Sequence, residues 1–441
     1  MILGAGMTGL AAGLVSGLPI LEASEFPGGI CSSYYLRPNS SQRLHVAPRD
    51  GNAYRFEIGG GHWIFGGDPV VLRLVRSLVE VRTYVRKSTV YFPDRELVVP
   101  YPIQNHLRYF GTDLAVRALR EMTEALSAVS RTRRTMADWL RESFGPTLCE
   151  LFFDSFHDLY TAGLWKRIRP QDGYKSPVNL SLAIQGAFGD APPVGYNATF
   201  VYPAEGLNTL AQRMAVRCKI HYGKRVVRID SRDKALFFDD QSVMRYTTVL
   251  STLPLNRMME LAGLTLDEEP DPSPSVLVIN IGATKGPRCP GDHWVYVPRS
   301  NAGFHRAGFY SNVDPLFLPS DSHRRQDRVS IYVEKAYPDG QKPTEVELRA
   351  VCRDVLEQLQ AWGWIEAAEV VDPTWIDVAY TWSWPGSTWR ERALQVLESH
   401  EIYQVGRFAR WVFQGIADSI RDGLMAGGAM DAHGLSRQDS G

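Results

Sequence analysis

The chain begins with a long stretch that contains no charged side chain, from Met1 to Leu21. Apolar residues gather at its two ends, in Ile2–Leu3 and Leu18–Leu21, and glycines are spread between them. This pattern predicts a buried strand, a turn, a helix and a second buried strand. Five glycines interrupt the stretch and no basic residues precede it, so we expect neither a membrane span nor a signal peptide.

Two kinds of hydrophobic pattern follow along the rest of the chain. Apolar residues at helical spacing predict a helical insertion from Leu107 through Trp165, and glycines and prolines predict a loop-rich segment at 170–193. Short apolar runs predict strands at 219–222, 225–229, 247–254, 276–283, 293–297, 329–333 and 401–407. Further patterns predict a helix that ends at 216, helices at 348–362 and 418–430, and a polar tail at 435–441.

Charge and cysteine content exclude several classes of protein. The 48 basic and 49 acidic side chains give a net charge of -1, which argues against a nucleic-acid-binding protein. The 5 cysteines are widely spaced and form no C-x-x-C, so we expect reduced thiols and neither a disulfide framework nor a metal site. Without an export signal, the chain is predicted to be cytoplasmic, with no membrane partner.

The sequence Gly4-Ala5-Gly6-Met7-Thr8-Gly9 lies between the first predicted strand and the first predicted helix. In such a G-x-G-x-x-G turn the first glycine makes the tight turn, and the second lets the backbone approach a pyrophosphate. The third lets the helix pack on the strand. Glu22 ends the second predicted strand and can accept hydrogen bonds from ribose hydroxyls. Strand, glycines, helix, strand and acid in this order predict a dinucleotide-binding fold.

Two further glycine clusters, Gly28-Gly29 and Gly59-Gly60-Gly61 before His62, suit a long ligand such as FAD better than a nicotinamide cofactor. Here the chain resembles the flavoprotein superfamily of amine oxidases, protoporphyrinogen oxidases and UDP-galactopyranose mutases. In that superfamily the glycines and the acid hold FAD, and the later glycine cluster lies against the isoalloxazine ring. The resemblance implies that FAD is bound by Gly4, Gly6, Gly9, Glu22, Gly28, Gly29, Gly60, Gly61, His62, Val227 and Arg407.

The resemblance also implies the fold. We expect an α/β protein with a Rossmann-like FAD-binding domain of the GR2 type, a mixed or antiparallel substrate-binding sheet and a helical insertion. The FAD-binding domain is predicted to be discontinuous, from residues 1–80, 203–265 and 400–435. The substrate-binding sheet is assigned to 85–106 and 270–398, and the helical insertion to 107–195.

Several separated segments narrow the resemblance to the UDP-galactopyranose mutases, and most closely to their eukaryotic-type pattern. They are Y-P-x-Q-N at 101–105, N-A-T-F at 197–200, W-x-Y-x-P at 294–298, F-x-R-A at 304–307 and G-R-F-x-x-W at 406–411. The resemblance implies that His62 and Arg306 are catalytic. It implies that the substrate is bound by Tyr101, Gln104, Asn105, Trp165, Asn197, Tyr296 and Arg306. Two tyrosines that hold the diphosphate in these mutases have Trp384 and Phe413 as their nearest matches.

A purely structural role stays open for the predicted substrate residues. The aromatic ones could line a core or a cleft wall, and the arginines could pair with surface carboxylates. Gln104 and Asn105 could cap a helix that starts near Leu107, and Asn197 could stabilise a turn.

The resemblance implies a flavin-dependent nucleotide-sugar mutase that interconverts the pyranose and furanose forms of an NDP-hexose. There the sugar forms a covalent adduct with N5 of reduced FAD, so no catalytic triad or acid pair is needed. NAD(P)H is the expected reductant, the nucleotide sugar is the expected partner, and a homo-oligomer stays open. Two alternatives remain: an FAD-dependent oxidoreductase of the amine oxidase or protoporphyrinogen oxidase type, and a non-enzymatic protein that retains FAD.

Overall fold

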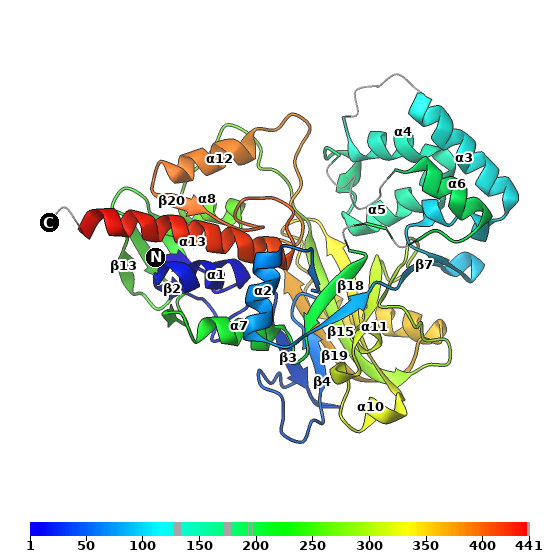
Figure 1. Ribbon diagram of the computed structural model, residues 1–441, viewed down its shortest axis with the longest axis horizontal. Coiled ribbons are helices and arrows are strands. Elements are labelled where there is room, and N and C mark those ends of the chain that lie inside the picture. Colours follow the sequence, from blue (N-terminus) through cyan, green and yellow to red (C-terminus); the bar gives the residue numbers. More distant parts are fainter. Residues whose placement is uncertain (128–133, 171–177, 193, 196, 439–441) are drawn as a thin grey trace.

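The computed structural model describes residues 1–127, 134–170, 178–192, 194–195 and 197–438 (Figure 1). The N-terminal segment belongs to a parallel sheet with the strand order β10-β2-β1-β14-β20. Its strands are β10 Ile220–His221, β2 Ile20–Leu21, β1 Ile2–Leu3, β14 Val249–Ser251 and β20 Ile402–Gln404. The strands predicted at 219–222, 247–254 and 401–407 therefore join the first two strands in one sheet.

Helices cover both faces of the parallel sheet. They are α1 Met7–Ser16, α7 Leu207–Ala215 and α13 Ile416–Gln438 on one face, and α8 Leu255–Leu261 and α12 Trp389–Glu398 on the other. Because side chains alternate along a strand, Ile2 and Ile20 pack toward α1, whereas Leu3 and Leu21 pack toward α8 and α12. The uncharged N-terminal stretch is therefore a buried strand, helix and strand, as predicted.

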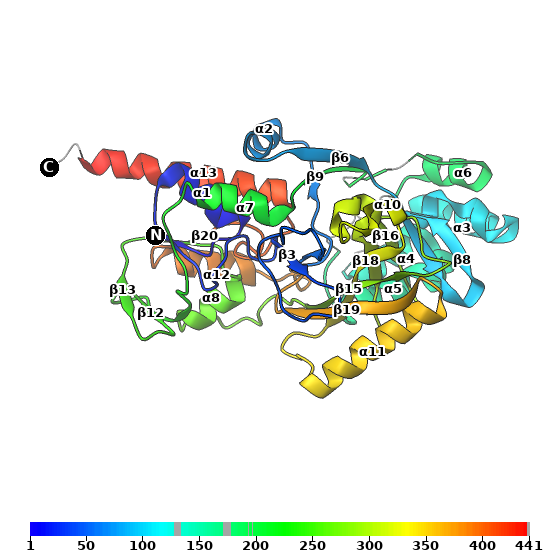
Figure 2. The same ribbon diagram turned by 90° about the horizontal axis from the view of Figure 1, so that it is seen from below.

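The last helix, α13, lies along α1 (Figure 2). Glycines let the two backbones approach closely. A Cβ atom on Gly423 would lie 2.2 Å from the Thr8 carbonyl oxygen, and one on Gly427 would lie 2.4 Å from the Ala12 carbonyl oxygen. The helix continues to Gln438, beyond the end predicted at residue 430, because helix propagation costs little once a long helix is formed. In the described part of the chain, no helix is long and apolar enough to cross a membrane.

A second, mixed sheet has seven strands in the order β19-β15-β18-β17-β16-β7-β8, all antiparallel except for the pair β16 and β7. Its strands are β19 Ile365–Ile376, β15 Ser275–Lys285, β18 Arg328–Tyr337, β17 Arg306–Phe309, β16 Trp294–Tyr296, β7 Ser88–Phe92 and β8 Leu97–Pro100. Helix α11, Glu345–Ala361, covers one face, where Ile331 and Val333 are buried (Figure 2). The alternate positions Tyr332 and Glu334 lie on the opposite face and line a cavity.

The predicted helical insertion forms a separate group of helices beside the seven-stranded sheet (Figure 1). It contains α3 Thr112–Ser127, α4 Met136–Leu148, a π turn at Cys149–Phe153, α5 Asp154–Tyr160, a short turn at Leu164–Lys166 and α6 Leu180–Phe188. Helix α6 lies inside the segment predicted to be loop-rich, so that prediction is wrong for these residues. Asn179 caps α6, and Gly186 lets it approach the backbone of Asn105, where a Cβ atom would lie 1.8 Å from the carbonyl oxygen.

Smaller elements connect these three parts and place loops around the cavity. The small sheets contain β3 Ser33–Leu36 and β4 Tyr54–Glu57; β5 Ile64–Phe65, β9 Thr199–Pro203 and β6 Val81–Val85; and β11 Val226–Asp230, β12 Ala235–Phe238 and β13 Val243–Arg245. The remaining helices are α2 Pro69–Leu78, α9 Tyr310–Val313, α10 Ser322–Arg325 and the turns Pro93–Arg95, Ile103–Asn105, Leu107–Phe110 and Pro315–Phe317. Strand β4 leads into the loop that carries His62.

Candidate active site

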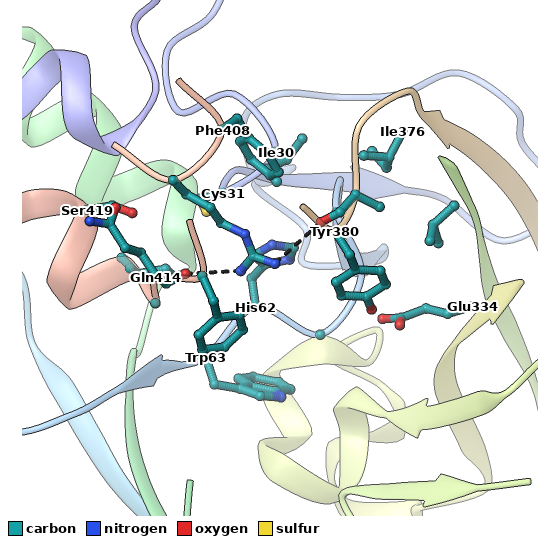
Figure 3. Close-up of a pocket in the computed structure, with 18 of the residues that line it drawn as sticks. Ile30, Cys31, His62, Trp63, Glu334, Ile376, Tyr380, Phe408, Gln414 and Ser419 are labelled. Atoms are coloured by element: carbon teal, nitrogen blue, oxygen red, sulfur yellow. Dashed lines mark hydrogen bonds between the residues drawn. The ribbon is translucent and has the colours of Figure 1, made fainter. Parts of the chain in front are cut away.

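A cavity of about 600 Å³, here called the main cavity, opens where the parallel sheet, the seven-stranded sheet and the helical group meet. Glycines of the parallel sheet line one end, and arginine and aromatic side chains line the other. Figure 3 shows the middle, where Cys31, His62, Tyr380 and Gln414 converge. Its size is ordinary for a small-molecule site.

The glycine end of the main cavity lies at the carboxyl end of β1. Gly4 has a φ of 94°, which favours glycine, and Gly6 pairs with Gly28 in a parallel bridge. Glu22 accepts hydrogen bonds from the backbone N–H of Ala5 at 2.7 Å and of Ser24 at 2.8 Å. The structure therefore brings together the predicted cofactor residues Gly4, Gly6, Glu22, Gly28 and Gly29.

This glycine end fits the phosphates and ribose of a flavin dinucleotide. No side chain caps the N-terminus of α1 at Gly6, so its first N–H groups are available to an anion. A Cβ atom on Gly6 would meet nothing within 4 Å, so the space in front of it is open. Gly9 does not line the cavity; a Cβ atom there would lie 1.9 Å from the Gly4 carbonyl oxygen, which is the helix–strand contact predicted for it.

His62 lies in the middle of the main cavity on the loop that follows β4 (Figure 3). Burial, and then the positive charge of Arg407, lower the pKa of His62 to about 4, so the imidazole is neutral at neutral pH. Gly61 beside it also lines the cavity, and a Cβ atom there would lie 2.0 Å from the Tyr332 hydroxyl. The loop therefore needs glycine to pass the sheet so closely.

Arg407 lies close to His62, held by backbone carbonyl groups. Its guanidinium donates to the carbonyl oxygens of Gln414 at 3.0 Å and Ala379 at 3.3 Å, and it lies 4.9 Å from the centre of the Phe413 ring. Its Nε atom is buried without a hydrogen-bond partner. Within the described residues no carboxylate pairs with Arg407, so the surface ion pair considered for it is absent.

Arg306 and Glu334 form a buried ion pair on neighbouring strands of the seven-stranded sheet. The Arg306 Nε atom donates to Glu334 Oε2 at 3.1 Å, and Nη2 donates to the same carboxylate. Burial alone would raise the pKa of Glu334, but the charge of Arg306, with help from His305, lowers it to about 2. The predicted residue Arg306 therefore lines the main cavity beside a permanently charged carboxylate.

Aromatic rings line the far end of the main cavity. The rings of Tyr101 and Tyr296 lie 4.6 Å apart, and both line the cavity, as does Asn197. Asn197 accepts a hydrogen bond from Arg86, which is 6% exposed and also donates to the Val194 carbonyl oxygen at 2.9 Å. The three predicted residues therefore lie near one another, around an arginine that sequence reasoning did not identify.

Three predicted substrate residues are placed behind this aromatic wall. Gln104 and Asn105 are 1% and 0% exposed in the turn after Tyr101, and neither lines the main cavity. The cap considered for them is also absent, because the turn that begins at Leu107 has no side-chain cap. Trp165 is 2% exposed and donates a hydrogen bond of 2.6 Å to Asp158 instead of facing the cavity.

Two predicted cofactor residues also lie outside the cavity wall. Val227 is 49% exposed on β11, which belongs to a small antiparallel sheet. Gly60 has a φ of 79°, and a Cβ atom there would lie 2.9 Å from Glu334 Oε1, so it shapes the His62 loop from behind.

The structure identifies three cavity residues that sequence reasoning missed: Arg86, Glu334 and Tyr380. The Tyr380 hydroxyl points toward Glu334 (Figure 3), and burial followed by the charge of Glu334 raises the pKa of Tyr380. Trp384, the predicted counterpart of the first diphosphate tyrosine, does not line the cavity, because its ring Nε1 donates to the Pro270 carbonyl oxygen at 3.0 Å. Tyr380, four residues earlier, does line the main cavity, and so does Phe413, the nearest match of the second diphosphate tyrosine.

The sequence carries a weak signal for Glu334 and Tyr380. Glu334 interrupts an apolar strand two positions after Tyr332, which is the spacing of one strand face. Tyr380 could have been found only by shifting the match within the aromatic run 380–384. No pattern distinguishes Arg86 from a surface arginine; only its burial does.

The chain is similar to known flavin-containing proteins in sequence and in fold. A family model described as flavin containing amine oxidoreductase matches residues 18–427. No curated protein sequence matches the chain. A crystal structure of reduced UDP-galactopyranose mutase superposes with a TM-score of 0.81 and 21% identity, over 98% of this chain and 95% of that one.

Two other solved structures have lower similarity. Cyclohexylamine oxidase from Brevibacterium oxydans has a TM-score of 0.62 and 13% identity, over 98% of both chains. A fatty acid isomerase from P. acnes that produces CLA has a TM-score of 0.57 and 15% identity, over 96% of both chains. These similarities confirm the predicted α/β fold class.

Proposed function

Because the chain belongs to the family of flavin-containing amine oxidoreductases, we propose that it binds FAD and interconverts the pyranose and furanose forms of a nucleotide-linked hexose. The similarity in fold to a UDP-galactopyranose mutase supports this proposal. The observation that carries it is the charge of the main cavity beyond the glycine end.

That charge favours an anionic substrate. Arg86 is buried, and among the described residues no carboxylate lies within ion-pair distance of it. Within the described residues Arg407 has carbonyl acceptors and no carboxylate partner, and Arg306 pairs with Glu334. Asp377, which is exposed, also lines the main cavity, so apart from Glu22 at the glycine end three guanidinium groups face two carboxylates. A diphosphate would be attracted by this excess of guanidinium charge, whereas a protonated amine would be repelled.

In this proposal the glycine end would hold the phosphates and ribose of FAD, and His62 and Arg407 would contact its ring system. The reduced flavin, when bound, would supply the nucleophile for the anomeric carbon of the substrate. Arg306, Arg86 and Tyr380 hold the diphosphate, while Tyr101 and Tyr296 hold the base. His62 remains neutral, so it can donate a hydrogen bond without adding a charge.

We assign the FAD-binding domain to residues 1–80, 203–265 and 400–435, the substrate-binding sheet to 85–106 and 270–398, and the helical insertion to 107–195. The last part of 270–398 is α12, which packs on the parallel sheet and therefore belongs with the FAD-binding domain. NAD(P)H is the proposed reductant of the flavin, and the cytoplasm is the proposed location of the protein. A homo-oligomer is the assembly to be tested.

The experiment uses the purified yellow protein, reduced with dithionite under anaerobic conditions. UDP, dTDP and GDP are titrated while the flavin spectrum is followed, and the protein is then incubated with the matching NDP-hexoses. We expect one nucleotide to shift the spectrum, and a pyranose–furanose interconversion that occurs only with reduced flavin. No response to any nucleotide, with no interconversion, would contradict the proposal.

A matched pair of variants tests the charge argument. Arg86→Gln should weaken nucleotide binding by about tenfold or more, because a charge-assisted hydrogen bond is worth about 1.5–3 kcal/mol. Arg37→Gln is the control: Arg37 follows β3, is 41% exposed and pairs with the exposed Asp50 outside the main cavity. If the two variants bound the nucleotide equally well, Arg86 would not contribute to nucleotide binding, and the charge argument for the proposed function would be contradicted.

A second candidate is an FAD-dependent oxidoreductase of the amine oxidase type. It is favoured by Phe413, which places an apolar ring in the cavity wall and cannot donate a hydrogen bond to a phosphate. Reduction of the bound flavin by amines, porphyrinogens or sugar alcohols, without any response to nucleotides, would favour this function.

A further inference from the structure

A second cavity of about 340 Å³ lies next to the main cavity. Tyr380, Arg407 and Phe413 line both cavities, so these three side chains form the wall between them. The second cavity is also lined by Arg169 and Arg390, and we call it the arginine cavity. None of the residues proposed above to hold FAD or the substrate, apart from Tyr380 and Arg407, belongs to it.

Three parts of the chain supply the arginines. Arg169 follows the short turn Leu164–Lys166 of the helical group, and its backbone N–H donates to the Ser383 carbonyl oxygen at 2.9 Å. Arg390 lies in the first turn of α12, and Arg407 lies in the turn after β20. Side chains from separate elements that meet at one cavity can grip a ligand from several sides.

The arginine cavity carries an excess of positive charge. Three guanidinium groups line it, and within the described residues no carboxylate does. Two carboxylates lie close by. Glu391 pairs with Arg390, and burial raises the pKa of Asp271 although the positive charge of Arg169 opposes this rise. Both carboxylates lie outside the described lining of the cavity, whereas the three guanidinium groups belong to it, and guanidinium groups that converge on one cavity favour a compact anion.

One lining residue of the arginine cavity, Trp411, is buried in a strained backbone conformation. Trp411 is 2% exposed, and its ring Nε1 donates to the Trp382 carbonyl oxygen at 2.9 Å. Its φ of 56° is a left-handed conformation that a bulky residue adopts only under constraint. Such strained residues occur often at ligand-binding positions, because the surrounding contacts fix them.

From these observations we propose that the arginine cavity binds a phosphate group. Guanidinium groups match the oxygens of phosphate in pairs, and the hydroxyl-bearing residue Thr381 also lines the cavity. The phosphate group has two possible sources: free inorganic phosphate, or the phosphate of a ligand that reaches past Phe413 from the main cavity. Because Arg407 belongs to both cavities, binding in one affects binding in the other.

The test measures the binding of inorganic phosphate to the whole protein by calorimetry and thermal shift, at constant ionic strength. Arg390→Gln and Arg169→Gln should each weaken phosphate binding by about tenfold or more, and Arg390→Lys should recover part of it. Arg392→Gln is the matched control, since Arg392 lies in the same helix, pairs with Glu268 at 3.5 Å and does not line the cavity. It should bind phosphate as the wild type does.

The proposal is overturned if the wild type shows no phosphate binding, or if Arg390→Gln and Arg392→Gln bind phosphate equally well. A second titration, with UDP at saturating phosphate, identifies the source. Competition between the two assigns the phosphate group to a ligand shared with the main cavity, and simultaneous binding assigns it to a separate molecule; both support the site. This test requires neither flavin chemistry nor sugar turnover, so its failure is distinct from failure of the proposed function.

Discussion

Backbone forms the wall at one end of the main cavity, whereas side chains form it at the other. Gly4, Gly6, Gly28 and Gly29 lie within a short N-terminal stretch, and Glu22 is held among them by backbone donors. At the other end, Arg86, Tyr296, Arg306, Glu334 and Tyr380 come from separate strands and loops.

This difference predicts how each end responds to substitution. A backbone wall has no side chain to trim, so a change there adds atoms and blocks the fold or the ligand. A side-chain wall can be altered one group at a time, because the sheet beneath it stays in place. The glycine end should therefore fail completely when it is changed, and the side-chain end should change in graded steps.

The largest effect is expected for Gly9→Ala. The new Cβ atom would lie 1.9 Å from the Gly4 carbonyl oxygen, so α1 must move away from β1. We expect a loss of about 4 kcal/mol or more in the free energy of unfolding, with loss of bound flavin, measured by chemical denaturation and by the visible spectrum. Gly428→Ala is the control, because nothing lies within 4 Å of that position on α13; there stability should be unchanged or rise. If Gly9→Ala kept its flavin, the expected intolerance of the glycine end to substitution would be contradicted.

A smaller but still large effect is expected for Arg306→Met. Removing the guanidinium leaves the Glu334 carboxylate buried without its partner, which costs about 3–5 kcal/mol of unfolding free energy. The double variant Arg306→Met with Glu334→Leu should recover most of this loss, because it removes the stranded charge as well. Denaturation of the two variants at pH 7 measures the difference, and equal stability would show that the pair is not coupled.

A substitution at Glu57 tests the core between the glycine end and the side-chain end of the main cavity. Glu57 is the last residue of β4, just before the loop that carries His62. It accepts hydrogen bonds from Ser33 at 2.7 Å and from Tyr202, yet burial raises its pKa to about 7. A carboxyl group with a raised pKa in the folded state stabilises the protein below its unfolded pKa, and this contribution is lost as the pH rises through about 7. In the wild type, the free energy of unfolding should fall by about 3 kcal/mol between pH 4.5 and 8 because of Glu57. We expect Glu57→Gln to lack this fall, so that its free energy of unfolding, measured by denaturation across this pH range, changes less with pH. Parallel profiles would contradict this.

The smallest effect is a gain at the side-chain end. Phe413→Tyr adds a hydroxyl donor to the wall shared by both cavities, and we expect UDP to bind about tenfold more tightly as a result. Trp384→Tyr is the control, since Trp384 does not line the main cavity and its replacement should leave UDP affinity unchanged. Titration of UDP against the flavin spectrum measures both. An unchanged affinity in Phe413→Tyr would indicate that no phosphate lies near this wall.

Much of the fold could be predicted from hydrophobic patterns, because these are local. The strand, helix and strand of the N-terminus, the helices beginning at Leu107, and the strands β14, β15, β16, β18 and β20 follow from spacing alone. Strands β7, β8 and β17 of the seven-stranded sheet were not predicted. Helix α6 was missed because its contact with the Asn105 backbone depends on a distant segment. Strand β19 was missed because its pattern is mixed at a sheet edge, where burial differs along its length.

For the site, the sequence by itself determined the glycine end, because a turn that needs glycine and an acid that follows a strand leave a local signature. It also indicated which separated segments carry arginine and tyrosine. Only the tertiary structure decided which side chains reach the main cavity: it placed Tyr101 there and Gln104 behind it, and it brought in Arg86. The physical reason is that a side-chain wall depends on strand register and burial, and these are set by contacts between residues far apart in the chain.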